Sequence, residues 1–148
     1  MPSARYHHHV TVDAAPEDLW SAMQEPAAWI GVGPIEHVHD PSFSEEGYLE
    51  RYYWDATIAG RGWDGTATTR HADPGRTMEI HLDSSEMTAI VTAELTPCEA
   101  GTEMEVAIRA RTKGMLSGLF WGVIDQTIRS SIKSQVERFA ERLVARSS

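Results

Sequence analysis

The chain has 148 residues, and its 22 acidic against 13 basic side chains give a formal net charge of −9 at pH 7. A negative chain is repelled by phosphate backbones and anionic lipids, so we expect neither nucleic acid nor a charged membrane surface as a partner. This length suits one domain, which we take as residues 1–148. The single cysteine, Cys98, cannot form an intramolecular disulfide, as suits a reducing compartment.

Apolar runs in the sequence are short. None approaches the ~20 residues of a membrane span, and the first residues lack the apolar core of a signal peptide. We therefore expect a cytoplasmic protein without stable membrane insertion.

The first predicted element is a strand over residues 5–12, RYHHHVTV. Side chains alternate along a strand, so one face carries Tyr6, His8, Val10 and Val12, and the other carries His7, His9 and Thr11. Because no further His or Cys cluster could complete a site around His7 and His9, we expect no metal. The roles of His7, His9, His37 and His39 stay open.

Two short helices follow the strand. Pro16 suits the first position of a helix over DAAPEDLWSAMQ, and Pro26 opens a second brief helix that ends at Gly31 and Gly33.

Apolar and polar residues then alternate, as is typical of half-buried strands. Strands are predicted over 48–59, 62–72, 77–83, 86–95 and 103–111, with a further strand around 35–39 whose inward face is ambiguous. Short turn sequences between them predict antiparallel neighbours.

From about Met115 the period becomes helical and continues to the end of the chain. Asp125 and Arg129, four residues apart, are expected to form a surface ion pair on this helix. The predicted fold is α+β: a curved antiparallel sheet of about six to seven strands wrapped around one long C-terminal helix.

Two segments carry a family resemblance. VTVDAAPEDLWSAM at the front and GMLSGLFWGVIDQTIRSSIKSQVERFAERL at the back resemble the START/polyketide-cyclase superfamily, also called SRPBCC or helix-grip. The chain looks most like the polyketide cyclase/dehydrase and lipid-transport branch, over essentially its whole length. The resemblance rests on no invariant catalytic motif. It implies an apolar ligand between helix and sheet, and only some members are enzymes.

The inward-facing residues suggest room for such a ligand. Small residues such as Ala56, Gly65 and Ala89 lie on the inward faces, and Gly114, Gly118 and Gly122 cannot fill the space near the start of the helix. We expect the cavity there. The predicted ligand-binding residues are Trp29, Tyr52, Trp54, Trp63, Met87, Met104, Phe120, Trp121 and Ile124. The alternative is that these side chains only form the core.

The start of the long helix, residues 115–124, is apolar on all sides. Such a helix should be covered on both sides, by the short helices 16–32, a homodimer partner, or a bilayer surface touched during ligand exchange. We favour the short helices.

One polar pair could support catalysis. A two-residue turn at Gly60-Arg61 would set Trp54 opposite Ala67 and Glu50 opposite His71. Burial would then shift the pKa values of Glu50 and His71, so that the two groups could act as an acid–base pair. The alternative is a cross-strand ion pair at the rim. No sequence pattern for a phosphate loop, zinc site or nucleophile elbow is present, so we expect no cofactor.

Three functions follow. The leading hypothesis is binding or transport of a hydrophobic small molecule, lipid, polyketide-like or polycyclic, favoured by aromatic side chains that stack on flat ligands. The second is a cyclase or aromatase-like enzyme in which Glu50 and His71 transfer protons and Tyr52 holds an oxygen. The third is a protein-interaction module that uses the apolar patch at 115–123.

Overall fold

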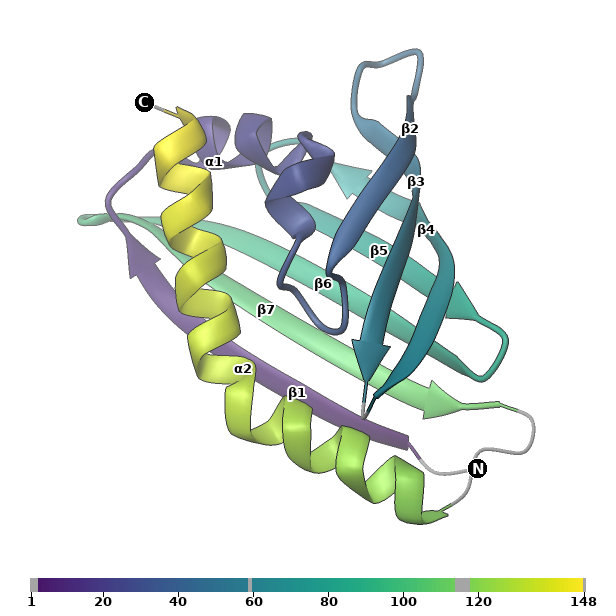
Figure 1. Ribbon diagram of the computed structural model, residues 1–148. Helices are drawn as coiled ribbons and strands as arrows, with labels where there is room; N and C mark the ends of the chain where they lie inside the picture. The colour runs from purple at the N-terminus through teal and green to yellow at the C-terminus, as the bar shows by residue number, and fades with distance from the viewer. Residues whose placement is uncertain (1–2, 59, 114–117, 148) are drawn as a thin grey trace.

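The alternating segments form one antiparallel sheet with a long helix across it, in a computed structural model that describes residues 3–58, 60–113 and 118–147 (Figure 1). The elements in chain order are β1 Ser3–Val12, α1 Pro16–Met23, the 3-10 helix η1 Pro26–Trp29, β2 His37–Phe43, β3 Leu49–Ile58, β4 Arg61–Asp73, β5 Thr77–Ser84, β6 Met87–Cys98, β7 Gly101–Thr112 and α2 Gly118–Ser147. Within the described residues the sheet has seven strands in the order β1-β7-β6-β5-β4-β3-β2. The predicted α+β class and the element order are confirmed.

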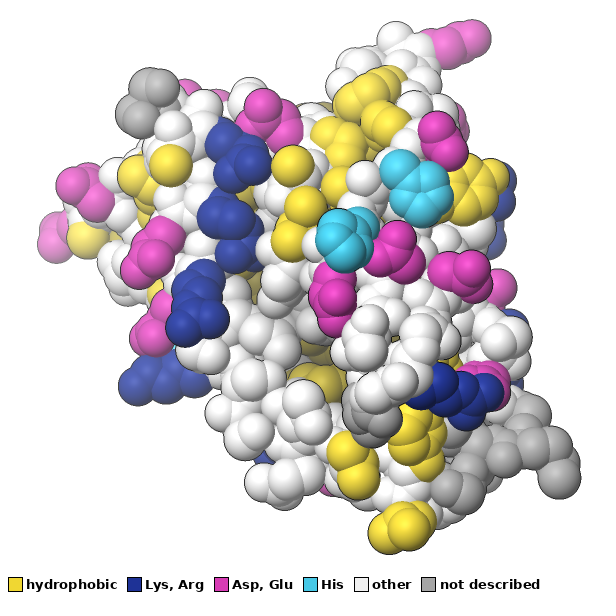
Figure 2. All heavy atoms as spheres, viewed as in Figure 1, with side chains coloured by type: hydrophobic (Ala, Val, Ile, Leu, Met, Phe, Trp, Pro, Cys, Tyr) yellow, Lys and Arg dark blue, Asp and Glu magenta, His cyan; other side chains and the backbone are white. Residues whose placement is uncertain are grey.

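The core lies between the sheet and α2. In Figure 1, α2 crosses in front of the sheet along β1, with α1 and η1 beside its C-terminal end. The helix buries one stripe, formed by Ile124, Ile128, Val136, Phe139, Ala140 and Leu143. Figure 2 shows a row of Lys and Arg side chains along the same helix, away from that stripe.

β1 follows the predicted alternation. Tyr6 and Val12 are buried, and His8 and Val10 are half-buried on the same face. The opposite face, with His7, His9 and Thr11, is exposed. The histidine run is therefore part of the fold.

The short helices begin at Pro16 and Pro26, as predicted. They pack against the C-terminal end of α2, where Arg142 Nε donates a 3.1 Å hydrogen bond to the carbonyl oxygen of Ala28. The Trp29 and Phe139 ring centroids lie 4.8 Å apart at the same end.

The prediction that the short helices cover residues 115–124 is therefore wrong for residues 118–124. Residues 115–117 lie outside the described residues. The physical reason is length, because a helix of 30 residues spans about 45 Å. Two short helices at one end cannot reach the other end.

The register of β3 and β4 differs from the prediction by two residues. Cα partners are Ile58 with Arg61, Ala56 with Trp63, Trp54 with Gly65, and Tyr52 with Ala67. The turn comes one residue earlier than expected, and Gly60 lies in it with φ +77°, a conformation that favours glycine. A two-residue shift keeps the side chains of the paired segments 51–58 and 61–68 on their predicted faces.

Gly65 makes room for Trp54. A Cβ at Gly65 would lie 2.0 Å from the Asp83 carbonyl oxygen and 2.8 Å from Trp54 Cζ2. The indole crosses the neighbouring strand, and Trp54 Nε1 donates a 3.0 Å hydrogen bond to the Thr66 carbonyl oxygen. No other residue type fits there without moving the strands.

Candidate ligand-binding site

The predicted ligand-binding side chains form part of the interior between sheet and helix. Seven are buried and two, Phe120 and Trp121, are half-buried. The buried ones are Trp29, Tyr52, Trp54, Trp63, Met87, Met104 and Ile124. The structure thus brings all nine into or against one hydrophobic core.

Polar atoms within this interior fall into two groups. Trp29 Nε1 donates to the Met23 carbonyl oxygen at 2.9 Å, and Trp54 Nε1 is bonded to Thr66. Tyr52 Oη and Trp63 Nε1 are buried, and neither has a hydrogen-bond partner within the described residues. Burial also raises the pKa of Tyr52 well above its usual range.

Buried polar atoms in proteins are nearly always hydrogen-bonded, so these two call for an explanation. Trp63 pairs with Ala56, which is four residues, or about 13 Å, along β3 from Tyr52. The two residues therefore lie at different positions along the strands, and a ligand could form a hydrogen bond with either atom separately.

A pocket of about 310 Å³ opens between the segment after η1, the end of β3 and α2. Its lining is Gly31, Gly33, Pro34, Ile35, Glu36, Thr57, Ile58, Met87, Ile124, Thr127, Ile128 and Gln135. Met87 and Ile124 belong to the predicted set. Ile58 alternates with polar residues along its strand and Ile128 follows Ile124 by four residues, so periodicity places both inward. No local pattern indicates that they meet Ile35 at one opening.

An aromatic stack ties the first turn of α2 to β4. The Trp63 and Phe120 rings are nearly parallel, at 6°, with centroids 5.5 Å apart. The Arg61 guanidinium lies 5.2 Å from the Trp63 centroid and pairs with Glu86. Phe120 therefore covers Trp63, although Phe120 is not part of the buried stripe of α2.

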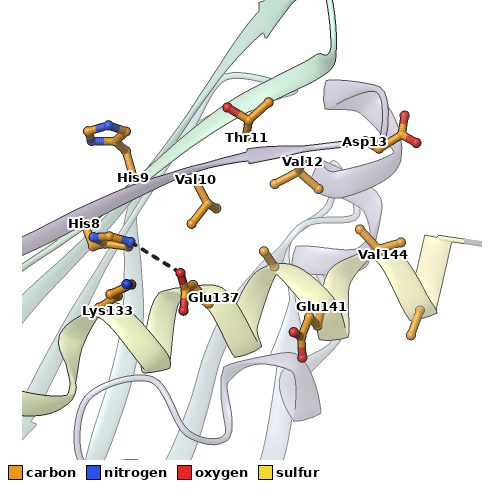
Figure 3. A pocket seen from close by; sticks show the side chains of 12 residues that line it. His8, His9, Val10, Thr11, Val12, Asp13, Lys133, Glu137, Glu141 and Val144 are labelled. Carbon is orange, nitrogen blue, oxygen red and sulfur yellow. Dashed lines mark ion pairs between the residues drawn. The ribbon is translucent and has the colours of Figure 1, made fainter.

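A larger hollow of about 840 Å³ runs along the edge strand β1 (Figure 3). Val10, Val12 and Val144 line it together with charged groups, and His8 Nε2 lies 4.0 Å from Glu137 Oε2. This groove is more open than the pocket, and in the sheet order three strands separate β1 from β4 and four separate it from β3. We place the candidate site at the smaller pocket, because Met87 and Ile124 of the predicted set line it and Ile58 of β3 lies at its opening. Tyr52 and Trp63 are not among its lining residues.

The predicted Glu50–His71 pair is wrong. Both side chains are exposed, and the Cα partner of His71 is Glu79 on β5. The cause is a register irregularity on each strand: one beside Leu49, where pairing with β2 shifts, and one between Thr69 and His71. Each shift reverses the alternation, so fully buried Leu49 takes the inward position expected for Glu50.

Two other histidines form exposed ion pairs. His7 Nδ1 lies 3.8 Å from Glu105 Oε2, and His37 Nδ1 lies 2.6 Å from Asp55 Oδ1. In the part of the chain that the structure describes, no three His, Cys, Asp or Glu side chains are grouped as a metal site would need. No described helix combines the length and the apolar character needed to cross a membrane.

Comparisons with known proteins show the fold. No protein-family model and no curated protein matches the sequence. Among solved structures, a START superfamily protein from Mycobacterium smegmatis is 13% identical with a TM-score of 0.69, covering 95% of this chain and 98% of that one. A protein from Thermus thermophilus is 15% identical with a TM-score of 0.71, covering 99% and 100%.

A third similar structure is Ara h 8.0201, at 12% identity and a TM-score of 0.64, covering 97% of this chain and 99% of that one. Similarity over nearly the full length at such low identity reflects a shared backbone arrangement. The chain therefore shares the fold of these structures, with a curved antiparallel sheet around a long C-terminal helix, and this is the helix-grip arrangement that its sequence pattern predicts.

Proposed function

We propose that the chain binds or carries a hydrophobic small molecule with at least one hydrogen-bonding atom, between the sheet and α2. The observation that supports this most is the pair of buried, unpartnered polar atoms, Tyr52 Oη and Trp63 Nε1, within an aromatic interior of the described residues. A polar ligand atom would satisfy either of them, and the aromatic rings would stack on a flat ligand.

The pocket supports the same ligand class. Small-molecule pockets are mostly apolar with a few polar groups and range over about 300–1,000 Å³. The pocket, at about 310 Å³, lies at the lower end of this range of volumes. We therefore propose a compact ligand, such as a small polycyclic or a short acyl compound. The fold supports this location, since the resemblance to the START superfamily implies a ligand between helix and sheet.

We propose no reaction. The acid–base pair on which the enzyme hypothesis depended is not formed, because Glu50 and His71 lie on the exposed side of different strands. Tyr52 remains a candidate for a hydrogen bond to a ligand oxygen. Such a contact serves ligand binding and does not require a reaction.

The test is a fluorescence titration with aminoanthracene, a flat polycyclic probe with one amine. Two variants add the same side chain to exposed positions of α2: Thr127→Trp, at the pocket, and Ser134→Trp, which does not line it. We expect Thr127→Trp to weaken binding by about tenfold or more, equivalent to ~1.4 kcal/mol. Ser134→Trp should bind like the parent protein.

Two results would contradict the proposal. One is a protein that binds neither aminoanthracene nor a fatty acid series and shows no bound molecule in native mass spectrometry. The other is binding that Thr127→Trp leaves unchanged, which would place the site elsewhere, such as in the groove along β1.

A further inference from the structure

The face of the sheet that points away from α2 carries a cluster of three arginines. Arg5 on β1 and Arg109 on β7 are direct Cα partners, and Arg111 is two residues along β7, opposite Ser3. All three side chains are exposed on the same face. By strand geometry Arg5 and Arg109 are about 5 Å apart and Arg109 and Arg111 about 7 Å at their Cα atoms.

Acidic side chains do not neutralise this cluster. Within the described residues no ion pair joins Arg5, Arg109 or Arg111 to a carboxylate, although the chain has 22 acidic residues. Asp83 lies in the ladder row of Arg111, two strands away, but its carboxylate is 2.8 Å from Lys113 Nζ. Like charges directly opposite each other on a sheet are destabilising, so the arrangement costs stability in the absence of an anion.

A hollow lies at the cluster. It measures about 370 Å³ and is lined by Ser3, Ala4, Arg5, Thr88, Ile90, Arg109, Ala110 and Arg111. Ser3 and Thr88 add hydroxyl groups, which can donate to an anion. A second hollow of about 590 Å³ shares Thr88 and Ile90 with the first and reaches Arg51, Arg70 and His81.

The strand register places Arg51, which lines the second hollow, in the same row across the sheet as Arg5 and Arg109. The row runs Arg5, Arg109, Ile90, His81, Thr68 and Arg51 through successive Cα pairs. Four strand spacings separate Arg109 from Arg51, or about 19 Å. A compact anion would therefore meet only the three arginines on β1 and β7.

We propose that this face of the sheet binds a small molecule through a multiply charged oxyanion, a phosphoryl or polycarboxylate group, held by the guanidinium groups of Arg5, Arg109 and Arg111. Guanidinium forks match the geometry of both groups and form charge-assisted hydrogen bonds with them. The site lies on the opposite face of the sheet from the ligand pocket and does not depend on the proposed function.

The experiment is an NMR titration of ¹⁵N-labelled protein with pyrophosphate, and separately with citrate, at constant ionic strength. We expect saturable shifts confined to amides near Arg109, including those of Thr88 and Ile90. Stronger binding of pyrophosphate would assign a phosphoryl ligand, and stronger binding of citrate a carboxylate ligand. Arg109→Gln should weaken either by about tenfold, as expected for loss of one charge-assisted hydrogen bond.

The matched control is Arg138→Gln, which removes an exposed arginine of α2 and should leave binding unchanged. Arg109→Gln should not lower the unfolding temperature, because it removes a like-charge pair. If the unfolding temperature of Arg109→Gln is lower, Arg111→Gln serves as the second variant. Shifts that are linear and spread over the protein, or equal weakening by Arg138→Gln, would overturn the site. Unchanged aminoanthracene binding in these variants separates this result from the test of the pocket.

Discussion

Tyr6 Oη donates a 2.6 Å hydrogen bond to Asp125 Oδ1, joining the first strand to the last helix across 119 residues of sequence. Arg129 completes the arrangement, with Nη2 at 2.9 Å from the same carboxylate oxygen and its guanidinium 5.1 Å from the Tyr6 ring centroid. The ion pair between Asp125 and Arg129 was predicted, but its role in holding α2 against β1 was not.

Replacing Tyr6 with Phe should lower the free energy of unfolding by about 1.5–3 kcal/mol, the typical net value of a hydrogen bond to a charged group. Urea unfolding followed by circular dichroism measures the difference. Tyr53→Phe is the control, because Tyr53 is 39% exposed and makes no such bond to the described residues of α2. Equal losses in the two variants would show that the Tyr6 hydroxyl contributes nothing specific.

The same contact predicts an acid dependence. Hydrogen bonds from Tyr6 and then from Arg129 hold the pKa of Asp125 below its ordinary value of 3.8. A depressed pKa contributes stability that is present above the unfolded-state value and is lost as pH falls through the folded-state value. The stability difference between the parent and Tyr6→Phe should therefore shrink below pH 3.8. A difference that stays constant on acidification would contradict this assignment.

Tyr52→Phe should stabilise the ligand-free protein and weaken ligand binding. Removing a buried hydroxyl that lacks a partner within the described residues relieves a desolvation cost of about 1–3 kcal/mol. The unfolding temperature of the ligand-free variant should rise, and its affinity for a ligand that accepts a bond from Tyr52 should fall. A lower unfolding temperature would indicate that the hydroxyl already has a partner.

The raised pKa of Tyr52 also predicts behaviour at high pH. The native state keeps the Tyr52 proton above the ordinary value of 10.0, whereas the unfolded state releases it. This group therefore leaves the free energy of unfolding independent of pH below pH 10.0 and lowers it as pH rises from there toward the folded-state value. The tyrosinate absorbance of the folded parent and of Tyr52→Phe should therefore be the same just above that pH. A difference between them before unfolding would contradict the burial.

Gly65→Ala tests the packing of Trp54. The added methyl group would collide with the Asp83 carbonyl oxygen, and overpacking of this kind costs about 1–3 kcal/mol or more. Gly62→Ala, on the same strand, is the control, since nothing lies within 4 Å of a Cβ there. Thermal unfolding should separate the two variants clearly, and similar unfolding temperatures would rule out the close contact.

The exposed start of α2 keeps the homodimer hypothesis testable. Leu119 is 84% and Val123 44% exposed, and Figure 2 shows apolar side chains where α2 begins. If a second copy covers this patch, Leu119→Ser should change a dimeric elution volume to a monomeric one in size-exclusion chromatography. A parent protein that already elutes as a monomer at high concentration would contradict it.

Local patterns determined much of this protein. Except at Glu50 and His71, the period-two alternation indicated which side chains of β1 and β3 to β7 face inward, because successive side chains on a strand point to opposite faces. Pro16 and Pro26 marked the starts of both short helices, since proline suits a first helical turn.

Tertiary structure decided the rest. The Glu50–His71 prediction failed because two register irregularities reversed the alternation, and such shifts depend on pairing with neighbouring strands rather than on the strand itself. The candidate pocket joins Ile35, Ile58, Met87 and Ile124 from four separate segments. The arginine cluster likewise needed the pairing of β1 with β7, which brings Arg5 beside Arg109. Between register irregularities, sequence alone specifies the face of a strand on which a side chain lies, but pairing between strands specifies its neighbour and the places where the alternation reverses.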